Sequence, residues 1–332
     1  MRPVQSLDNQ RTRMPTSGAA RRQAMRAPQE GTGLLFAGLC ALNGAFAPAV
    51  AKLTTAHAGA LFVAAASNAF AGTAAALVLW ARGDLGRLLR RDLAPRLLAI
   101  GALGTTAAHL LFYLGASRTS AIVTMLCLQI EPAYALLLAW LVLGHRPTPR
   151  RFGATFLLVA GIAIALGGSS LQGSVGVWFL LGTPLCWQLS HLIVLRRLVG
   201  VPAMILSSAR YVYGGALLVL LWLWLGHGDD ALPGATELAR LLPLLAVQGC
   251  VLGYVGTVCW YQAIIRLDLA RATAIVVPSI PLLSLAASFT ILGEVASLRQ
   301  WLGLLLTAGG ILAFVTAPHA TGRHAESVEA ET

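Results

Sequence analysis

The sequence predicts an all-α membrane protein in which ten transmembrane helices form two inverted five-helix repeats. Hydrophobic residues make up 57% of the chain and charged residues only 11%, whereas about a quarter of the residues in a soluble domain are charged. The charged residues gather in short clusters between long apolar runs. A third observation is an apolar pattern that recurs in both halves of the chain and predicts the repeat.

The apolar runs are long enough to cross a bilayer, which takes about 20 mostly apolar residues in a helix. Helices suit this setting because they satisfy their own backbone hydrogen bonds in lipid. The ten expected spans are 33–53, 60–80, 97–116, 121–143, 152–168, 174–195, 203–225, 241–264, 272–292 and 300–317.

Both ends of the chain are polar and lie outside the expected spans. Residues 1–32 hold six arginines and are expected to form a disordered, basic cytoplasmic tail, with a transit peptide as the alternative. Met1, Met14 and Met25 all remain candidates for the true start. Residues 318–332 are expected to form a C-terminal cytoplasmic tail.

The distribution of arginine and lysine predicts the orientation. With the N-terminus inside, the inner segments hold 19 basic residues and the outer segments hold four. Cytoplasmic loops carry such an excess of Arg and Lys. We therefore expect a multi-pass protein of the inner cell membrane with both termini in the cytoplasm.

The repeat appears at an offset of 149 residues. Residues 121–145 and 270–294 then share six identical pairs, one of which is Pro132 with Pro281. Since five spans is an odd number, the second half enters from the opposite side of the membrane, a common plan for secondary transporters. Gly153, Gly161, Gly303 and Gly310 are expected at helix-packing positions. The expected repeats are 33–168 and 174–317.

Other functional classes receive little support. The net charge of +11 is not accompanied by the basic and aromatic surface pattern of nucleic-acid-binding proteins. All five cysteines lie in apolar runs without a CxxC pair, so we expect free thiols and no metal or cofactor. No Walker loop supports direct ATP drive. The expected partners are a small-molecule substrate, a coupling proton and the bilayer, and a homodimer is compatible with the sequence.

Glu131 is the only acidic residue deep within an expected span. A charge at that depth costs several kcal/mol, and intramembrane ionisable residues are usually functional. One interpretation is a group that couples transport to protons or binds substrate. The alternative is a neutral carboxylic acid that hydrogen-bonds another helix and holds the bundle together.

Pro132, Pro278 and Pro281 are expected to interrupt their helices. Proline removes a backbone donor and clashes with the carbonyl one turn earlier. Matching interruptions at mid-depth in both halves indicate a binding site near the midplane. A packing kink without a binding role is the alternative.

Polar side chains at helical spacing are expected to line a cavity between the halves. A stripe of Thr124, Cys127, Glu131 and Tyr134 would run along one face of the 121–143 helix. The alternative for each residue is a hydrogen bond between helices. Arg210 is expected to pair with a substrate carboxylate or with Glu131, or to extend to the interface. The two histidines within spans are candidates for proton relays, because histidine titrates near neutral pH. The further cavity candidates are Thr106, His109, Tyr113, Tyr254, Thr257, Tyr261, Asn43, Gln188 and His191.

The segments "ASRTSAIVTMLCLQIEPAYALLLAWLVLGHRPTPRRFGATFLLVAGIAI" and "LDLARATAIVVPSIPLLSLAASFTILGEVASLRQWLGLLLTAGGIL" resemble the ten-helix EamA-type transporters of the drug/metabolite transporter superfamily. The shared features are a mid-helix proline, a "lGE" helix end and a following helix with spaced glycines. The resemblance implies a permease, often an exporter of amino acids or drug-like compounds, with a central cavity.

This chain departs from the family pattern at several positions. The glutamate of the "lGE" pattern is Glu294 in the second half, but the matching position of the first half holds His145. The first span has Asn43 where the family usually has tryptophan. The family arginine of the seventh span matches Arg210, with Asn68 as its expected counterpart in the second span.

Together these features predict a secondary transporter for small metabolites that works by alternating access, with Glu131 coupling transport to protons. An uncoupled facilitator, in which Glu131 binds a substrate amine, is the first alternative. A membrane-embedded lipid-modifying enzyme is the alternative from another class. Such enzymes need acidic or His-rich catalytic clusters at a membrane face, so we expect no enzymatic activity.

Overall fold

The computed structural model describes residues 18–144, 146–173, 175–267 and 269–317. Within these ranges the regular secondary structure is helical, and no strand occurs. Ten spans in the described part are long and apolar enough to cross a membrane. The predicted all-α class with ten spans is therefore confirmed.

We number the spans 1 to 10 in chain order. Span 1 is α1 (Gly18–Thr55), span 2 is α2 (Ala60–Ala81), span 3 is α3 (Ala94–Gly101) with the π-helical segment η2 (Ala102–Ala107) and α4 (Ala108–Arg118), and span 4 is α5 (Ala121–Leu128) with α6 (Glu131–Leu143). Span 5 is α7 (Pro149–Gly173), span 6 is α8 (Val175–Arg197), and span 7 is α9 (Ala203–Leu225). Span 8 is α10 (Ala235–Ala246) with the π-helical η4 (Val247–Val255) and α11 (Gly256–Leu267), span 9 is α12 (Leu269–Leu292), and span 10 is α13 (Leu298–Thr316). Short 3₁₀ turns, η1 (Leu85–Leu89) and η3 (Gly228–Asp230), lie in two loops.

The N-terminal tail differs from the prediction. Helix α1 begins at Gly18, so residues 18–32, expected to be disordered, are helical. This stretch contains several alanines, and alanine has the highest helix propensity. The rest of the expected N-terminal tail, the expected C-terminal tail and His145 lie outside the described residues.

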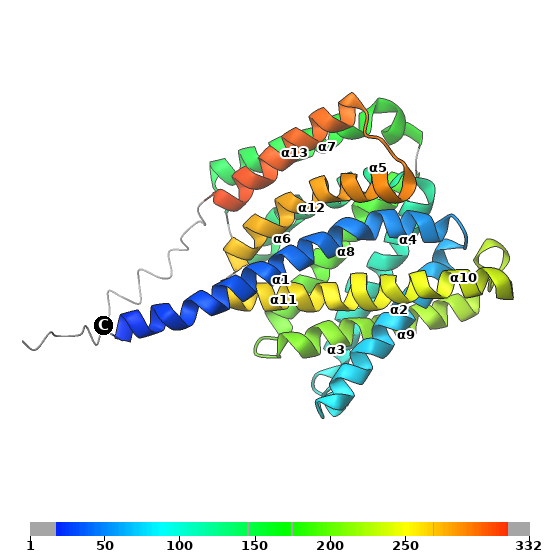
Figure 1. The fold of residues 1–332 in the computed structure, drawn as a ribbon, viewed down its shortest axis with the longest axis horizontal. Helices are drawn as coiled ribbons and strands as arrows, with labels where there is room; N and C mark the ends of the chain where they lie inside the picture. Colours follow the sequence, from blue (N-terminus) through cyan, green and yellow to red (C-terminus); the bar gives the residue numbers. More distant parts are fainter. Residues whose placement is uncertain (1–17, 145, 174, 268, 318–332) are drawn as a thin grey trace, which may run out of the picture.

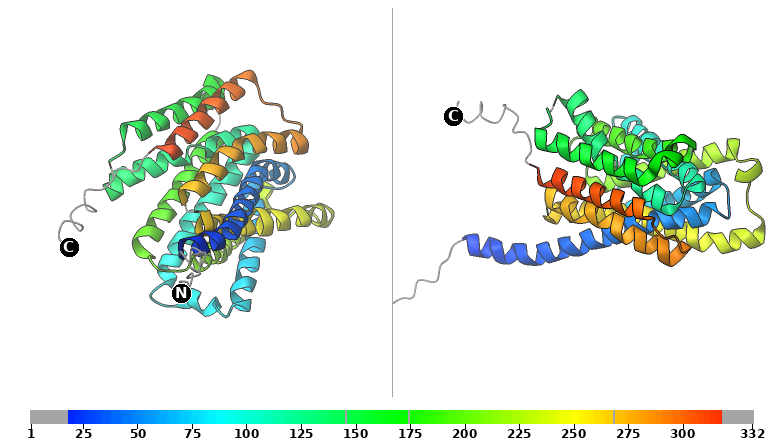
Figure 2. Two further views of the ribbon diagram at one scale, coloured as in Figure 1. Left: turned by 60° about the vertical axis from the view of Figure 1, so that its left-hand side comes forward. Right: turned by 90° about the horizontal axis from the view of Figure 1, so that it is seen from above.

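The helices pack with the two-fold pattern of an inverted repeat. Span 2 packs on its repeat mate, span 7, and span 5 packs on its mate, span 10, as α7 and α13 do in Figure 1. Span 1 packs on spans 8 and 9, and its mate, span 6, packs on spans 3 and 4. The start of α1 and the end of α13 lie at the same end of the bundle, as an even number of spans requires (Figure 2).

Glycines set the contact between α7 and α13. A Cβ on Gly161 would lie 2.6 Å from the backbone N of Thr307, and a Cβ on Gly310 would lie 2.6 Å from that of Leu158. Small residues let membrane helices approach closely, where van der Waals packing drives association. Gly153 meets nothing within 4 Å, so the predicted packing role is wrong there because it faces open space.

Glu294 joins the second half of the chain to the first. Its carboxylate accepts hydrogen bonds from the backbone N–H groups of Ala121 at 3.0 Å and Ile122 at 3.1 Å. These are the first residues of α5, whose N–H groups have no partner within the helix. The "lGE" glutamate is therefore a helix cap that connects spans 9 and 4.

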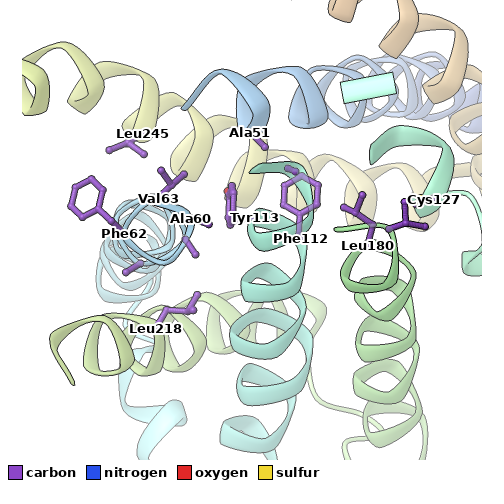
Figure 3. Close-up of a cluster of buried hydrophobic side chains, with 14 of the residues drawn as sticks. Ala51, Ala60, Phe62, Val63, Phe112, Tyr113, Cys127, Leu180, Leu218 and Leu245 are labelled. Atoms are coloured by element: carbon purple, nitrogen blue, oxygen red, sulfur yellow. The ribbon is translucent and has the colours of Figure 1, made fainter. Parts of the chain in front are cut away.

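The largest apolar cluster among the described residues joins most of the spans. Phe62, Phe112, Leu180, Leu218 and Leu245 meet there from spans 2, 3, 6, 7 and 8 (Figure 3). The cluster fixes these helices against one another, and the polar site described next is built on several of the same helices.

Candidate functional site

Span 4 is broken near its middle. Helix α5 ends at Leu128, and α6 begins at Glu131 with Pro132 in its first turn. The backbone N–H groups of Gln129 and Ile130 bond to carbonyls three residues earlier, at 3.2 and 3.3 Å. Glu131 therefore sits at the N-terminus of a helix inside the span, where the helix dipole favours a negative charge.

The two pieces of span 4 differ in packing. Six of the eight residues of α5 are buried, whereas α6 has no buried residue among those whose side chains are described. Thr124 and Cys127 are fully buried, while Glu131 and Tyr134 are partly exposed. The first two residues of the predicted stripe are therefore packed within the bundle, and the last two are accessible on the other side of the break.

Span 9 is not broken in the same way. Helix α12 runs through both Pro278 and Pro281, so the predicted second interruption is wrong. Pro281 is buried, and the neighbouring residues pack against α1, where Ile280 would lie 3.0 Å from a Cβ on Gly44. This neighbouring helix supports α12 on both sides of its prolines.

The side chain of Gln188 meets Glu131 directly. Its Nε2 donates a hydrogen bond of 2.8 Å to Glu131 Oε1. Gln188 lies on α8 and Glu131 on α6, so the bond joins spans 6 and 4. An amide donor stabilises a carboxylate at this depth, where polar groups without partners are costly.

Arg210 approaches the same region from α9. Its Nη2 donates a hydrogen bond of 2.6 Å to the carbonyl of Gly104 in η2. Its Nε is buried and has no partner among the described residues. A Cβ on Gly104 would lie 2.9 Å from this Nε, so glycine is what lets Arg210 reach the π-helical segment. π-Helical segments often occur at functional sites.

Arg210 is the electrostatic centre of the cluster. Its guanidinium lies within electrostatic range of Glu131, His109, His191 and Tyr211. No ion pair at contact distance joins Arg210 to Glu131 within the described ranges. Glu131, His109, His191 and Arg210 are all partly exposed.

The predicted tyrosines form hydrogen bonds between helices. Tyr113 OH accepts a bond of 2.9 Å from Gln248 and one of 3.1 Å from Ser67. Tyr254 OH lies 3.1 Å from the Ser208 hydroxyl. Tyr113 and Tyr254 are buried, so these two residues hold spans 2, 3, 7 and 8 together, which was the alternative for each of them.

His109 and Tyr211 connect these bonds to the charged cluster. His109 Nδ1 lies 2.7 Å from Asn68 Oδ1. The rings of His109 and Tyr211 have centroids 6.1 Å apart, and Tyr211 OH lies 3.0 Å from Thr257 Oγ1. Tyr211 and Gln248 were missed by the sequence reasoning, although each is a polar residue inside a span.

Two of the remaining candidates bond to backbone carbonyls of other helices, and a third is partly exposed. Asn43 donates a bond of 2.7 Å to the Val251 carbonyl in η4, so both π-helical segments receive a side-chain donor from another helix. Thr106 bonds to the Gly214 carbonyl at 3.1 Å. Tyr261 is partly exposed on α11. No group of three metal-ligating side chains occurs in the described part of the chain.

The counterpart of Arg210 also differs from the prediction. A Cβ on Gly72 would lie 2.8 Å from the Tyr211 carbonyl, and one on Gly215 would lie 2.5 Å from the Asn68 carbonyl. The two contacts are repeat equivalents when matching positions of spans 2 and 7 are 143 residues apart, because Gly72 then matches Gly215. Asn68 then corresponds to Tyr211, and the expected match to Arg210 is wrong by one residue.

Comparisons with known proteins agree with this architecture. The EamA-like transporter family matches residues 31–167 and 174–316. A curated relative, the "Probable terminal-alkyne amino-acid exporter" of Streptantibioticus cattleyicolor, is 26% identical over 235 residues, which are 70% of this chain and 77% of the relative. A solved crystal structure shares the fold with a TM-score of 0.60 at 16% identity, over 87% of this chain and 98% of the other.

Proposed function

Since the chain belongs to the EamA-like transporter family, we propose that it exports small amphipathic metabolites of the amino-acid class by alternating access. The family and the ten apolar spans make it a multi-pass membrane protein that transports a small molecule. They point to transport rather than to a lipid-modifying reaction. The exporter named for the relative supports both the direction and the substrate class.

The observation that carries the substrate class is the pair of unneutralised opposite charges. Arg210 on α9 and Glu131 on α6 are both partly exposed and lie within electrostatic range of each other, and no ion pair joins them in the described part of the chain. In this proposal an α-carboxylate binds the Arg210 guanidinium, which forms strong charge-assisted hydrogen bonds with carboxylates. The substrate ammonium binds Glu131, whose Oε1 is already oriented by Gln188.

Proton coupling follows if Glu131 exchanges its proton for the substrate amine. In the uncharged state the carboxyl keeps its bond from Gln188, and the loss of its charge lowers the cost of its position in the membrane. In the charged state it binds the amine. Protons would then be exchanged for substrate in opposite directions across the inner membrane.

Glu131→Gln is the test of coupling. The variant keeps the side-chain shape and a partner for Gln188 but cannot carry a proton. In proteoliposomes we expect transport of a radiolabelled apolar amino acid to lose its dependence on an imposed pH gradient and to slow by at least about tenfold, which corresponds to ~1.4 kcal/mol.

Two outcomes separate the rival mechanisms. If Glu131→Gln keeps the full pH-gradient dependence, the coupling mechanism is wrong. If the wild type transports without any dependence on the gradient, and the variant loses substrate binding, the protein is an uncoupled facilitator. Arg210→Lys serves as the matched control, because it keeps the positive charge near Glu131 but loses the guanidinium fork, so it should weaken binding of the carboxylate while leaving the gradient dependence of the remaining transport intact.

The orientation is also part of the proposal. The excess of Arg and Lys in alternate loops supports cytoplasmic termini. The test is a cysteine introduced at Arg240, an exposed residue in the first helix of span 8 close to its start, and labelled in intact cells by a membrane-impermeant maleimide. A cysteine at Arg150 should stay unlabelled until the cells are opened, and the reverse pattern would contradict the orientation.

A further inference from the structure

A pocket of about 470 Å³ lies at one end of the bundle, away from the charged cluster. It is bounded by the loop between spans 2 and 3 and by the connection between spans 6 and 7. Its lining combines two arginines with apolar side chains and one glycine: Arg87, Arg90, Leu93, Val199, Gly200, Val201, Pro202 and Ile205.

The walls of this pocket are held in place by the fold. Leu88, in η1 between the two arginines, is buried in an apolar cluster that also contains Leu97 and Ile205. The Tyr213 hydroxyl donates a bond of 2.6 Å to the Leu88 carbonyl, which ties the loop to α9. Arg96 donates a bond of 3.2 Å to the Arg197 carbonyl, which ties α3 to the end of α8.

The loop that supplies both arginines of the pocket carries a net positive charge. Residues 82–96 contain five arginines and two aspartates. Arg87 lies 3.1 Å from Asp84, and Arg90 lies 2.8 Å from Asp92. Arg90 donates to Asp92 through both Nε and Nη2. Since each guanidinium has five N–H donors, both arginines keep donors for a further anion in the pocket.

The apolar side chains around the arginines match the edge of a bilayer. Leu89 and Val199 are 76% and 81% exposed, and they flank the pocket on its two loops. Such exposure would be costly in water but suits contact with lipid. Leu93, Val201 and Ile205 line the same pocket as Arg87 and Arg90 and give it an apolar wall.

We propose that this pocket binds the phosphate group of an anionic phospholipid, with the first carbons of an acyl chain against the apolar wall. Basic pockets between membrane helices bind such headgroups, and guanidinium groups bind phosphate in a bidentate manner. Free phosphate has the same anionic chemistry, but it would leave the apolar wall and the exposed Leu89 and Val199 without a partner.

The test measures thermal stability of the purified full chain in neutral detergent with added phosphatidylglycerol, phosphatidylcholine or inorganic phosphate. We expect phosphatidylglycerol to raise the melting temperature by several degrees over phosphatidylcholine. The double variant R87Q/R90Q should lose this difference. Arg91→Gln removes one positive charge from the same loop outside the pocket lining, as each of the single variants Arg87→Gln and Arg90→Gln does inside it, and should keep the difference.

Three results would overturn the proposal. The first is an equal phosphatidylglycerol effect in R87Q/R90Q and wild type. The second is an equal loss in Arg91→Gln, which would indicate general charge attraction. The third is an inorganic phosphate effect as large as that of the lipid, which would indicate a site for a soluble anion.

If the double variant does not fold, the single variants Arg87→Gln and Arg90→Gln serve instead. Each is expected to lose part of the phosphatidylglycerol effect, and retention of the whole effect in both would also count against the site.

Discussion

Spans 4 and 9 are repeat mates that carry a proline at the same position, yet only span 4 is divided into two helices. Pro132 follows a turn at Gln129 and Ile130, whereas α12 continues through Pro281. The difference shows that the proline alone does not decide the break. What differs is the packing, because α12 lies along α1 (Figure 1), while α6 has no buried residue among its described side chains.

The same comparison locates the charge. Glu131 occupies the start of the loosely packed α6, and its repeat mate Ile280 occupies the packed face of α12 against α1. A carboxylate is tolerated where a helix terminus, an amide donor and an accessible surface are present together. The symmetric scaffold therefore holds an asymmetric site.

The largest expected effect comes from placing a charge at the packed position. Ile280→Glu would put a carboxylate against Gly44, and a charge within a membrane helix costs about 3 kcal/mol. We expect a strong decrease in the unfolding temperature in detergent. Ile280→Leu conserves volume and should cost less than about 1.5 kcal/mol. Equal stability of the two variants would show that the two spans are packed alike.

Removal of the proline at the break should mainly affect function. Pro132→Ala restores a backbone donor and permits α5 and α6 to join, which would turn Glu131 away from Gln188. We expect substrate transport in proteoliposomes to fall by about tenfold, or ~1.4 kcal/mol, without loss of stability. Unchanged transport would mean that the break does not position Glu131.

The contact of Glu294 with the start of α5, which joins span 9 to span 4, should have a moderate effect on stability. Glu294→Gln keeps one acceptor for the α5 N-terminus but loses the charge, and such caps contribute about 1 kcal/mol. We expect a small decrease in unfolding temperature together with a change in transport rate. Ser297→Ala removes the N-cap of α13, whose hydroxyl accepts from Gln300 N–H at 3.3 Å, and should lower stability similarly while leaving the transport rate unchanged.

The smallest effect is expected at the second proline. Pro281→Ala replaces a proline in the interior of a continuous helix. In an isolated helix, a proline at such a position costs about 3 kcal/mol. Because α1 already supports this part of α12, we expect a small rise in unfolding temperature and transport within about twofold of wild type. A tenfold loss of transport would give both prolines the same role.

The sequence predicts the fold well because a bilayer requires long apolar runs, and those runs can be counted. It also indicates Glu131, Gln188 and Arg210 individually, since each is a polar residue in such a run. It does not predict that Gln188, rather than Arg210, bonds to Glu131, because packing sets how each helix is rotated against its neighbours. The break in span 4 and the two π-helical segments also change which faces of spans 3, 4 and 8 point the same way.

The glycine contacts of α7 and α13 have a consequence for how the halves meet. Gly161 touches Gly303 and Thr307, while Gly310 touches Ala154 and Leu158. At an offset of 149 residues these are the same contacts seen twice, so the interface is isologous, as in a two-fold dimer. The two halves thus face each other across this contact as two antiparallel copies of one five-helix chain would, and a peptide connection makes permanent what would otherwise be an association between subunits.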